Sequence, residues 1–128
     1  MRALLTLIAA LLTAWFAVLT LNQWRGDRAS DDVLRRPEMS QADYTRNIDT
    51  LRRSELLDPG TNWTLVRAAA LALREPAQSQ RVAEAVLDRE PDNRAALSLV
   101  LDATRERDPR RFNRAAEQLR RLDPAGQR

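Results

Sequence analysis

The sequence predicts an all-α protein in which one transmembrane helix at the N-terminus precedes a short array of helical hairpins. Ala, Leu and Arg recur along the 128 residues and aromatic residues make up only 5%, a composition typical of helices. An uncharged apolar segment opens the chain, and after it apolar residues recur every three or four positions. Acidic residues followed by proline close three helical segments, at Pro59, Pro91 and Pro124.

The first expected helix spans residues 3 to 24 and is apolar over most of its length. From Ala3 to Leu21, 19 residues contain no charge and only three threonines. At about 1.5 Å per residue they cover roughly 28 Å, close to the roughly 30 Å hydrocarbon core of a bilayer. Trp24 and Arg25 follow, the residue types expected at a membrane interface. We therefore expect a transmembrane anchor over residues 1–25.

Two other interpretations of this segment are weaker. A cleaved signal peptide has an apolar stretch of about 7 to 15 residues and a small-x-small cleavage pattern. The sequence "LTLNQWRGD" offers bulky residues at that point instead. A fully buried core helix would need a larger domain around it. We expect a single-pass protein of the cytoplasmic membrane.

The side of the membrane on which the domain lies is predicted by two opposing signals. Arg25, Arg28, Arg35 and Arg36 after the apolar segment favour a cytoplasmic domain by the positive-inside rule. A short basic start before a long apolar segment instead resembles a signal anchor that exports the domain C-terminal to it. We expect an extracytoplasmic domain, with a cytoplasmic one as the alternative.

Residues 26–39 are expected to form a polar linker, because they show no sustained apolar periodicity and contain Pro37. A lead helix follows within residues 40–59, near 40–57. Ser40 stands at its expected N-cap, and Asp43 three residues later completes a capping-box-like pair. Its apolar stripe consists of Tyr44, Ile48, Leu51 and, at the end, Leu56.

Four more helices are expected in two similar units, 60–91 and 92–124. They lie near residues 62–74, 77–89, 93–106 and 110–122. The first helix of each unit carries apolar residues three or four apart, beginning at Trp63 and at Ala96. The prolines that close successive segments are 32 and 33 residues apart. We expect one helical domain over residues 40–124, followed by a tail at 125–128.

A repeat of about 34 residues built from two short helices resembles the tetratricopeptide repeat. Trp63 occupies the position of the family's first-helix aromatic residue, and Ala96 occupies it in the second unit. Arg67 and Val100 replace the family's glycine, so the units are divergent. The resemblance covers residues 60–124, with a half-unit at 40–59. Trp63 is expected in the core rather than on a binding surface.

The resemblance implies a binding role, because tetratricopeptide arrays typically bind a peptide or helix along an inner groove. Carried onto this chain, it implies a partner-binding set lined by the first helices: Arg67, Ala70, Val100 and Thr104. Among such proteins the chain is most similar to small anchored repeat proteins of bacterial envelope or surface-polysaccharide machinery. The expected partner is therefore a protein component of a membrane complex. The alternative is a structural accessory subunit that contacts its complex mainly through the transmembrane helix.

Residue inventory argues against an enzyme. The chain has no Cys, His or Lys and only three glycines, so thiol, histidine and lysine chemistry and phosphate-cradling loops are missing. We expect no catalytic, cofactor or metal site. From Gly26 onward 19 arginines face 18 acidic residues, alternating along the chain, whereas nucleic-acid binding needs an unopposed basic stripe. No nucleic-acid partner is expected, and the sequence indicates no particular oligomeric state.

Overall fold

The computed structural model describes residues 2–36, 38–58 and 60–123. Within these ranges the protein is all-helical, without a β-strand, so the predicted fold class is confirmed. The helices are α1 (Arg2–Arg35), α2 (Gln41–Glu55), α3 (Asn62–Ala72), α4 (Pro76–Leu87), α5 (Arg94–Thr104) and α6 (Pro109–Leu122). Bounds of α2 to α6 agree with expectation to within about two residues. Pro37, Pro59, Pro124 and the expected tail at 125–128 lie outside the described residues.

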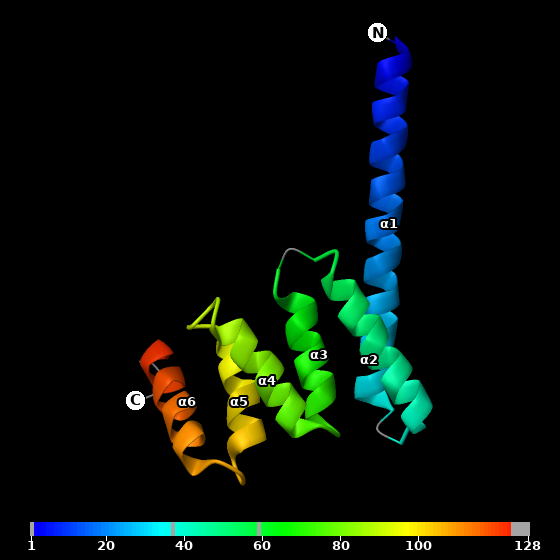
Figure 1. The fold of residues 1–128 in the computed structure, drawn as a ribbon. Coiled ribbons are helices and arrows are strands. Elements are labelled where there is room, and N and C mark those ends of the chain that lie inside the picture. Colours follow the sequence, from blue (N-terminus) through cyan, green and yellow to red (C-terminus); the bar gives the residue numbers. More distant parts are fainter. Residues whose placement is uncertain (1, 37, 59, 124–128) are drawn as a thin grey trace.

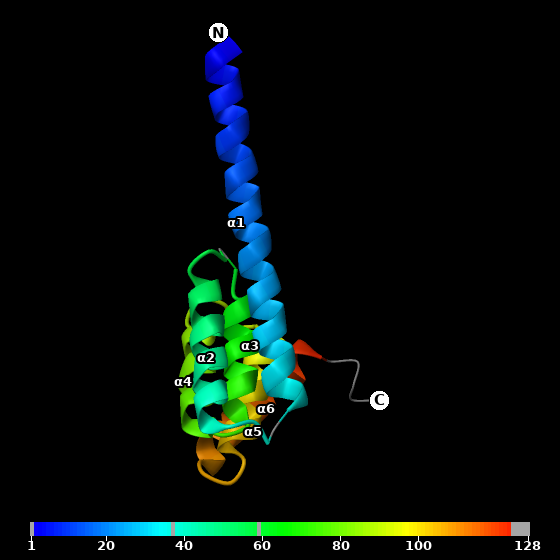
Figure 2. The same cartoon turned by 90° about the vertical axis from the view of Figure 1, so that its right-hand side faces the viewer.

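The helices form an array in which each packs against the next in the chain. In addition, α1 packs against α3 and α3 against α5. Neither α2 and α4 nor α4 and α6 pack against each other in the described part of the chain. Successive helices run in opposite directions, as Figure 1 shows, so α1 and α2, α3 and α4, and α5 and α6 form three hairpins. The N-terminal part of α1 projects from this array, away from every other helix (Figure 2).

Helix α1 does not end where the apolar segment ends. It continues without a break to Arg35, and Gly26, Ala29 and Val33 along it are buried. The linker expected over residues 26–39 is therefore wrong for residues 26 to 35. These buried residues are spaced three and four apart, but they are small and separated by charged ones, so their periodicity is weak in the sequence. The half-unit expected at residues 40–59 is therefore a complete hairpin, in which the C-terminal part of α1 packs against α2.

Trp63 of α3 packs directly on the backbone of α1 at Gly26. A Cβ atom at Gly26 would lie 2.6, 2.8 and 2.9 Å from the Cη2, Cζ2 and Cζ3 atoms of the indole. Trp63 is 7% exposed and belongs to one core cluster with Ala29, Val33 and residues of α2 and α3. The expected core position of Trp63 is confirmed. Its contact with α1 differs from expectation, because the contacted residue lies within the segment predicted to be a linker.

A second core cluster joins the later helices and contains mostly small side chains. Its buried members are Ala83, Val86, Ala96, Leu97, Val100 and Ala115. Alanines at helix contacts let the backbones approach closely, as the packing of α4, α5 and α6 requires. The two clusters meet across α3, which packs against both α1 and α5.

Side-chain caps fix where several helices begin. Ser40 Oγ accepts from Asp43 N–H at 3.1 Å and donates to the Asp43 carboxylate at 2.7 Å, which confirms the expected capping pair. Asn93 accepts from the Ala96 amide at 3.0 Å. At α3 the side chain of Thr61 makes no cap hydrogen bond, and Asp58 instead accepts from the Trp63 amide at 3.4 Å. Local capping signals thus set these helix starts.

Replacing Gly26 with alanine should loosen the attachment of α1. The new methyl group overlaps the rigid indole, and overpacking costs about 1 to 3 kcal/mol, more than the roughly 1 kcal/mol that alanine gains in a helix. We expect Gly26→Ala to lower the free energy of unfolding, measured by urea titration in detergent. Gly60→Ala is the matched control, because its nearest atom would be 3.4 Å away and its φ is not positive. Equal stability of the two variants would contradict this packing.

Tyr44 is buried at the α1–α2 end of the array, under the Arg74 guanidinium, which lies 4.7 Å from the ring centre. Its hydroxyl has no hydrogen-bond partner within the described residues. Burial raises the pKa of Tyr44 above its ordinary value of 10.0, and the Glu75 carboxylate adds to this, while Arg74 lowers it. Because the pKa of Tyr44 is higher in the folded state than in the unfolded state, its neutral form contributes to folding stability. This contribution is fully present below about pH 10 and is lost as the pH rises through the folded pKa.

Tyr44→Phe should therefore change stability most in alkaline solution. At neutral pH we expect it to be neutral or stabilising by about 1 kcal/mol or less, because it removes an unpaired buried hydroxyl. Above about pH 10 the unmodified chain should lose stability that the variant keeps. Tyr44 is the one tyrosine in the sequence, so tyrosinate absorbance reports its titration directly. A transition at the pKa of free tyrosine would contradict the burial.

Candidate functional site

Three of the four predicted partner-binding residues are in the core. Ala70 and Thr104 are 0% exposed and Val100 is 5% exposed. The Thr104 hydroxyl donates to the Val100 carbonyl at 2.7 Å, within α5. The faces expected to line an inner groove are covered because α3 and α5 pack against each other and against their neighbours. The expectation that Ala70, Val100 and Thr104 form an exposed binding surface is therefore wrong, because the three side chains pack in the core.

Arg67 lies instead at a groove and is paired with Glu55 across the α2–α3 contact. Its Nη2 donates to Glu55 Oε2 at 3.1 Å, and its Nε donates to Oε1. Each of the two side chains is 18% exposed. A bidentate arginine–carboxylate pair that is largely shielded from water fixes both planar groups. Arg67 thus joins α2 to α3 and forms part of the groove wall.

The groove lies between α2 and α4, with α3 as its floor. It exists because α2 and α4 do not pack against each other, although both pack against α3. Its volume is about 490 Å³. The lining residues come from the three helices, the α2–α3 connection and the turn after α4: Arg52, Glu55, Leu56, Asp58, Gly60, Thr61, Thr64, Arg67, Arg81, Val82, Ala85, Val86 and Arg89. We call this the α2–α4 groove.

The α2–α4 groove combines excess positive charge with an apolar wall. Arg52 of α2, Arg81 of α4 and Arg89, just after α4, line it without an ion-pair partner in the described part of the chain. Of its two acids, Glu55 is held by Arg67, and Asp58 accepts backbone hydrogen bonds from Gly60 and Trp63 at 3.0 and 3.4 Å. The arrangement suits an acidic segment that also carries apolar side chains.

A second groove, between α4 and α6, repeats the geometry without the excess of positive charge, because Arg111 and Arg114 line it together with Glu84 and Asp88. It measures about 480 Å³ and has Leu97 and Val100 of α5 at its floor. Arg111 on its wall pairs with Glu84 at 2.6 Å and with Asp108 at 3.2 Å. Because two acids balance the two arginines of its lining, the second groove attracts an acidic ligand less than the α2–α4 groove does.

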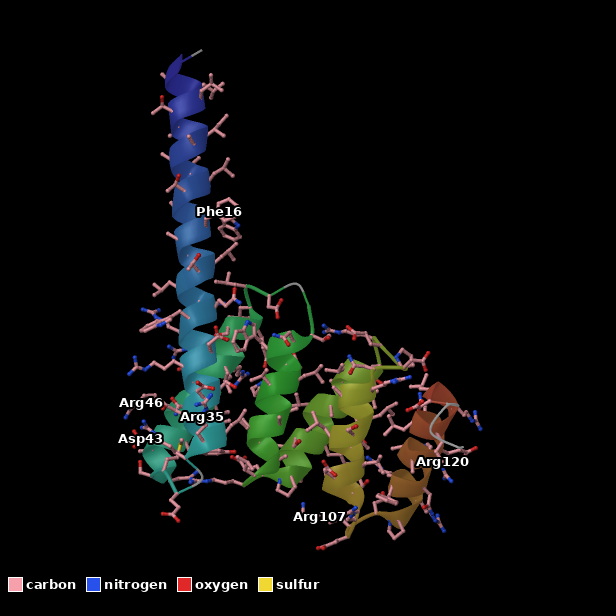
Figure 3. The ribbon with its side chains drawn as sticks, turned by 180° about the vertical axis from the view of Figure 1, so that it is seen from behind. Phe16, Arg35, Asp43, Arg46, Arg107 and Arg120 are labelled. Carbon is pink, nitrogen blue, oxygen red and sulfur yellow. The ribbon has the colours of Figure 1, made fainter. Side chains whose placement is uncertain are left out.

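The projecting part of α1 has the properties required to cross a membrane. Its most apolar 18-residue window has a mean hydropathy of 2.3, and none of that window is buried, which fits an anchor or a signal sequence. Trp24 and Arg25 are exposed, and the Arg28 guanidinium lies 5.6 Å from the Trp24 ring centre. Figure 3 shows Phe16 on the projecting part, whereas the labelled arginines lie on the array. The membrane-interface role of Trp24 and Arg25 stays a prediction.

Comparison of this chain with protein-family models, curated proteins and solved structures finds no match. The described residues contain no group of three or more acidic, His or Cys side chains placed to hold a metal ion. Function is therefore inferred from the fold, the anchor-like helix and the α2–α4 groove. Sequence patterns did not indicate Arg52, Arg81 or Arg89, because a groove between two helices that both pack on a third depends on how the hairpins are arranged.

The Arg67–Glu55 pair should show strong coupling in a double-mutant cycle. Arg67→Met leaves a largely shielded carboxylate without its partner, and we expect it to lower the free energy of unfolding by about 1 to 3 kcal/mol. Adding Glu55→Met should recover much of this loss, because two apolar side chains of similar volume replace the pair. Urea unfolding of the four chains measures the coupling. Additive losses would show that the two groups act independently.

Proposed function

We propose that this protein is a single-pass, membrane-anchored scaffold of the tetratricopeptide type that binds an acidic segment of a protein partner. The observation that supports it most is helix α1, which is apolar and exposed in its first part and belongs to the core cluster in its last part. The partner is held in the α2–α4 groove, where an apolar wall lies beside three arginines that have no ion-pair partner among the described residues.

The continuity of α1 favours an anchor over a cleaved signal sequence. No break separates the apolar segment from Gly26, and the helix holds Trp63 just past that segment. Bulky residues occupy the place where a signal peptide has small ones. The apolar segment thus stays attached to the domain and holds it at the membrane.

The tetratricopeptide assignment rests on the repeat in the sequence and on the packing of α3 against α5, the first helices of the two units. A place in bacterial envelope or surface-polysaccharide machinery follows from that resemblance. The chain would then lie in the cytoplasmic membrane with its domain on the outer side. The groove does not require either side, because its charge and shape are the same on both.

Site-specific crosslinking in native membranes tests the groove. A photoreactive residue at Arg52 or Arg81 should give crosslinks to one acidic protein. The matched control is Arg53, which is the next residue on α2, is also exposed and does not line the groove. We expect at least about fivefold more product from 52 and 81 than from 53. The product from 52 should be lost in Arg81→Glu, and the product from 81 should be lost in Arg52→Glu. Equal products from all three positions would rule out the groove.

The accessory-subunit alternative is favoured by one feature of α1. Small residues recur three and four apart along one face of its apolar part: Ala3, Thr6, Ala10, Thr13, Ala17 and Thr20. Small side chains let transmembrane helices approach closely. Crosslinks from positions 10 and 17, with none from 52 and 81, would support this alternative over the groove. A chain that crosslinks to no protein from any of these positions would contradict both.

A further inference from the structure

Two adjacent leucines in the α2–α3 connection face solvent. Leu56 is 83% exposed and Leu57 is 36% exposed, so the expectation that Leu56 continues the apolar stripe of α2 is wrong. Helix α2 ends at Glu55, and the Leu56 amide donates to the Arg53 carbonyl at 3.2 Å. This tighter last turn directs Leu56 away from the core. Single exposed leucines are ordinary, but an adjacent pair at one end of the molecule needs a reason.

The connection lies level with the end of the apolar segment of α1. Asn22 Nδ2 donates to the Ser54 carbonyl at 3.2 Å, which places the last turn of α2 beside Asn22. Because α2 runs opposite to α1, the residues after Ser54 extend toward the N-terminus of α1. Figures 1 and 2 show the α2–α3 connection as the part of the array that reaches furthest in that direction. Because the helix rise is about 1.5 Å per residue, Leu56 and Leu57 lie a few ångströms beyond the level of Asn22. They are thus at about the level of Leu19 and Leu21 on α1.

The exposure pattern of α1 marks the same level. Residues 3 to 18 of α1 are all exposed, and Leu19 and Asn22 are the first partly covered ones. The apolar segment ends at Leu21, two residues after Leu19. In a bilayer that holds residues 3 to 21 in its apolar core, the level of Leu56 and Leu57 is the boundary between acyl chains and headgroups.

The acidic groups beside the two leucines are compensated by other groups of the protein, so they can lie close to lipid. Glu55 is paired with Arg67, and the Asp58 carboxylate accepts hydrogen bonds from the amides of Gly60 and Trp63. Neither acid therefore presents an uncompensated charge to lipid. Arg53 is exposed one turn before Leu56, where its guanidinium can reach lipid phosphate groups.

We propose that Leu56 and Leu57 insert into the headgroup–acyl boundary and give the array a second contact with the bilayer that α1 spans. This rests on the proposed membrane anchor. A single spanning helix is free to rotate about its own axis, and the second contact removes that freedom. The α2–α4 groove, which has Leu56 at one end, then opens at the membrane surface in a fixed direction.

Single-cysteine labelling tests the insertion on the full chain, which has no cysteine of its own. Leu56→Cys, Leu73→Cys and Leu12→Cys would each carry a fluorophore in phosphatidylcholine–phosphatidylglycerol vesicles. Leu73 is the matched control, a leucine 53% exposed at the other end of α3. Its neighbour Arg74 donates to the Met39 carbonyl at 2.7 Å, in the α1–α2 connection far from the anchor. Leu12 reports whether α1 is in the bilayer.

Lipids that carry a nitroxide near the headgroup should quench the label at 56 at least about twofold more than the label at 73. A nitroxide deep in the acyl chains should quench the label at 12. Quenching at 12, with equal weak quenching at 56 and 73, would overturn the insertion and leave the anchor in place. A label at 12 that no lipid quencher reaches would overturn both. Matching unfolding curves for the three variants confirm that the comparison is between equally folded chains.

Discussion

The packing of the Trp63 indole on Gly26 makes one structure out of two parts of the chain. At that point an apolar helix that could otherwise lie apart from the domain becomes the first helix of the array. The contact needs a residue without a side chain on α1 and a large flat ring on α3, and it is shielded from water on both sides. Ala29 and Val33 then extend the contact along α1 toward the α1–α2 connection. The hydrogen bond from Asn22 to the Ser54 carbonyl then sets the level of the α2–α3 connection along α1.

The sequence predicts most helices well because their signals are local. Ser40 and Asn93 cap the helices that they precede, and apolar spacing indicates where each helix faces its neighbours. The extension of α1 could not be predicted in this way. Its buried residues are small and most of its other residues are charged, so hydrophobicity alone suggests a linker. Only the partner on α3 shows that the segment is packed. Leu56 shows the opposite error, an apolar residue that a tightened helix end directs outward.

The site was harder to predict than the fold. The resemblance to a repeat family placed Ala70, Val100 and Thr104 on a binding surface, yet they are small enough for α3 and α5 to bury. The arginines of the groove lie elsewhere, on helices that do not touch and that are joined through a third. Such a groove depends on long-range packing, for which the sequence contains no periodic signal. Arg67 is the one predicted binding residue that lines the groove, but its charge is paired with Glu55 and holds α2 against α3.

The unbroken course of α1 has a mechanical consequence. A flexible tether would decouple the array from the bilayer, whereas a continuous helix transmits every tilt of its apolar part to the helices packed on its other end. In a thinner bilayer a spanning helix tilts to keep its apolar length covered. The array would then swing as a lever about the membrane surface, with α6 moving furthest because it is the helix most distant from α1 (Figure 1). With α1 spanning a membrane as proposed, bilayer thickness would thereby set how far the α2–α4 groove lies from the surface.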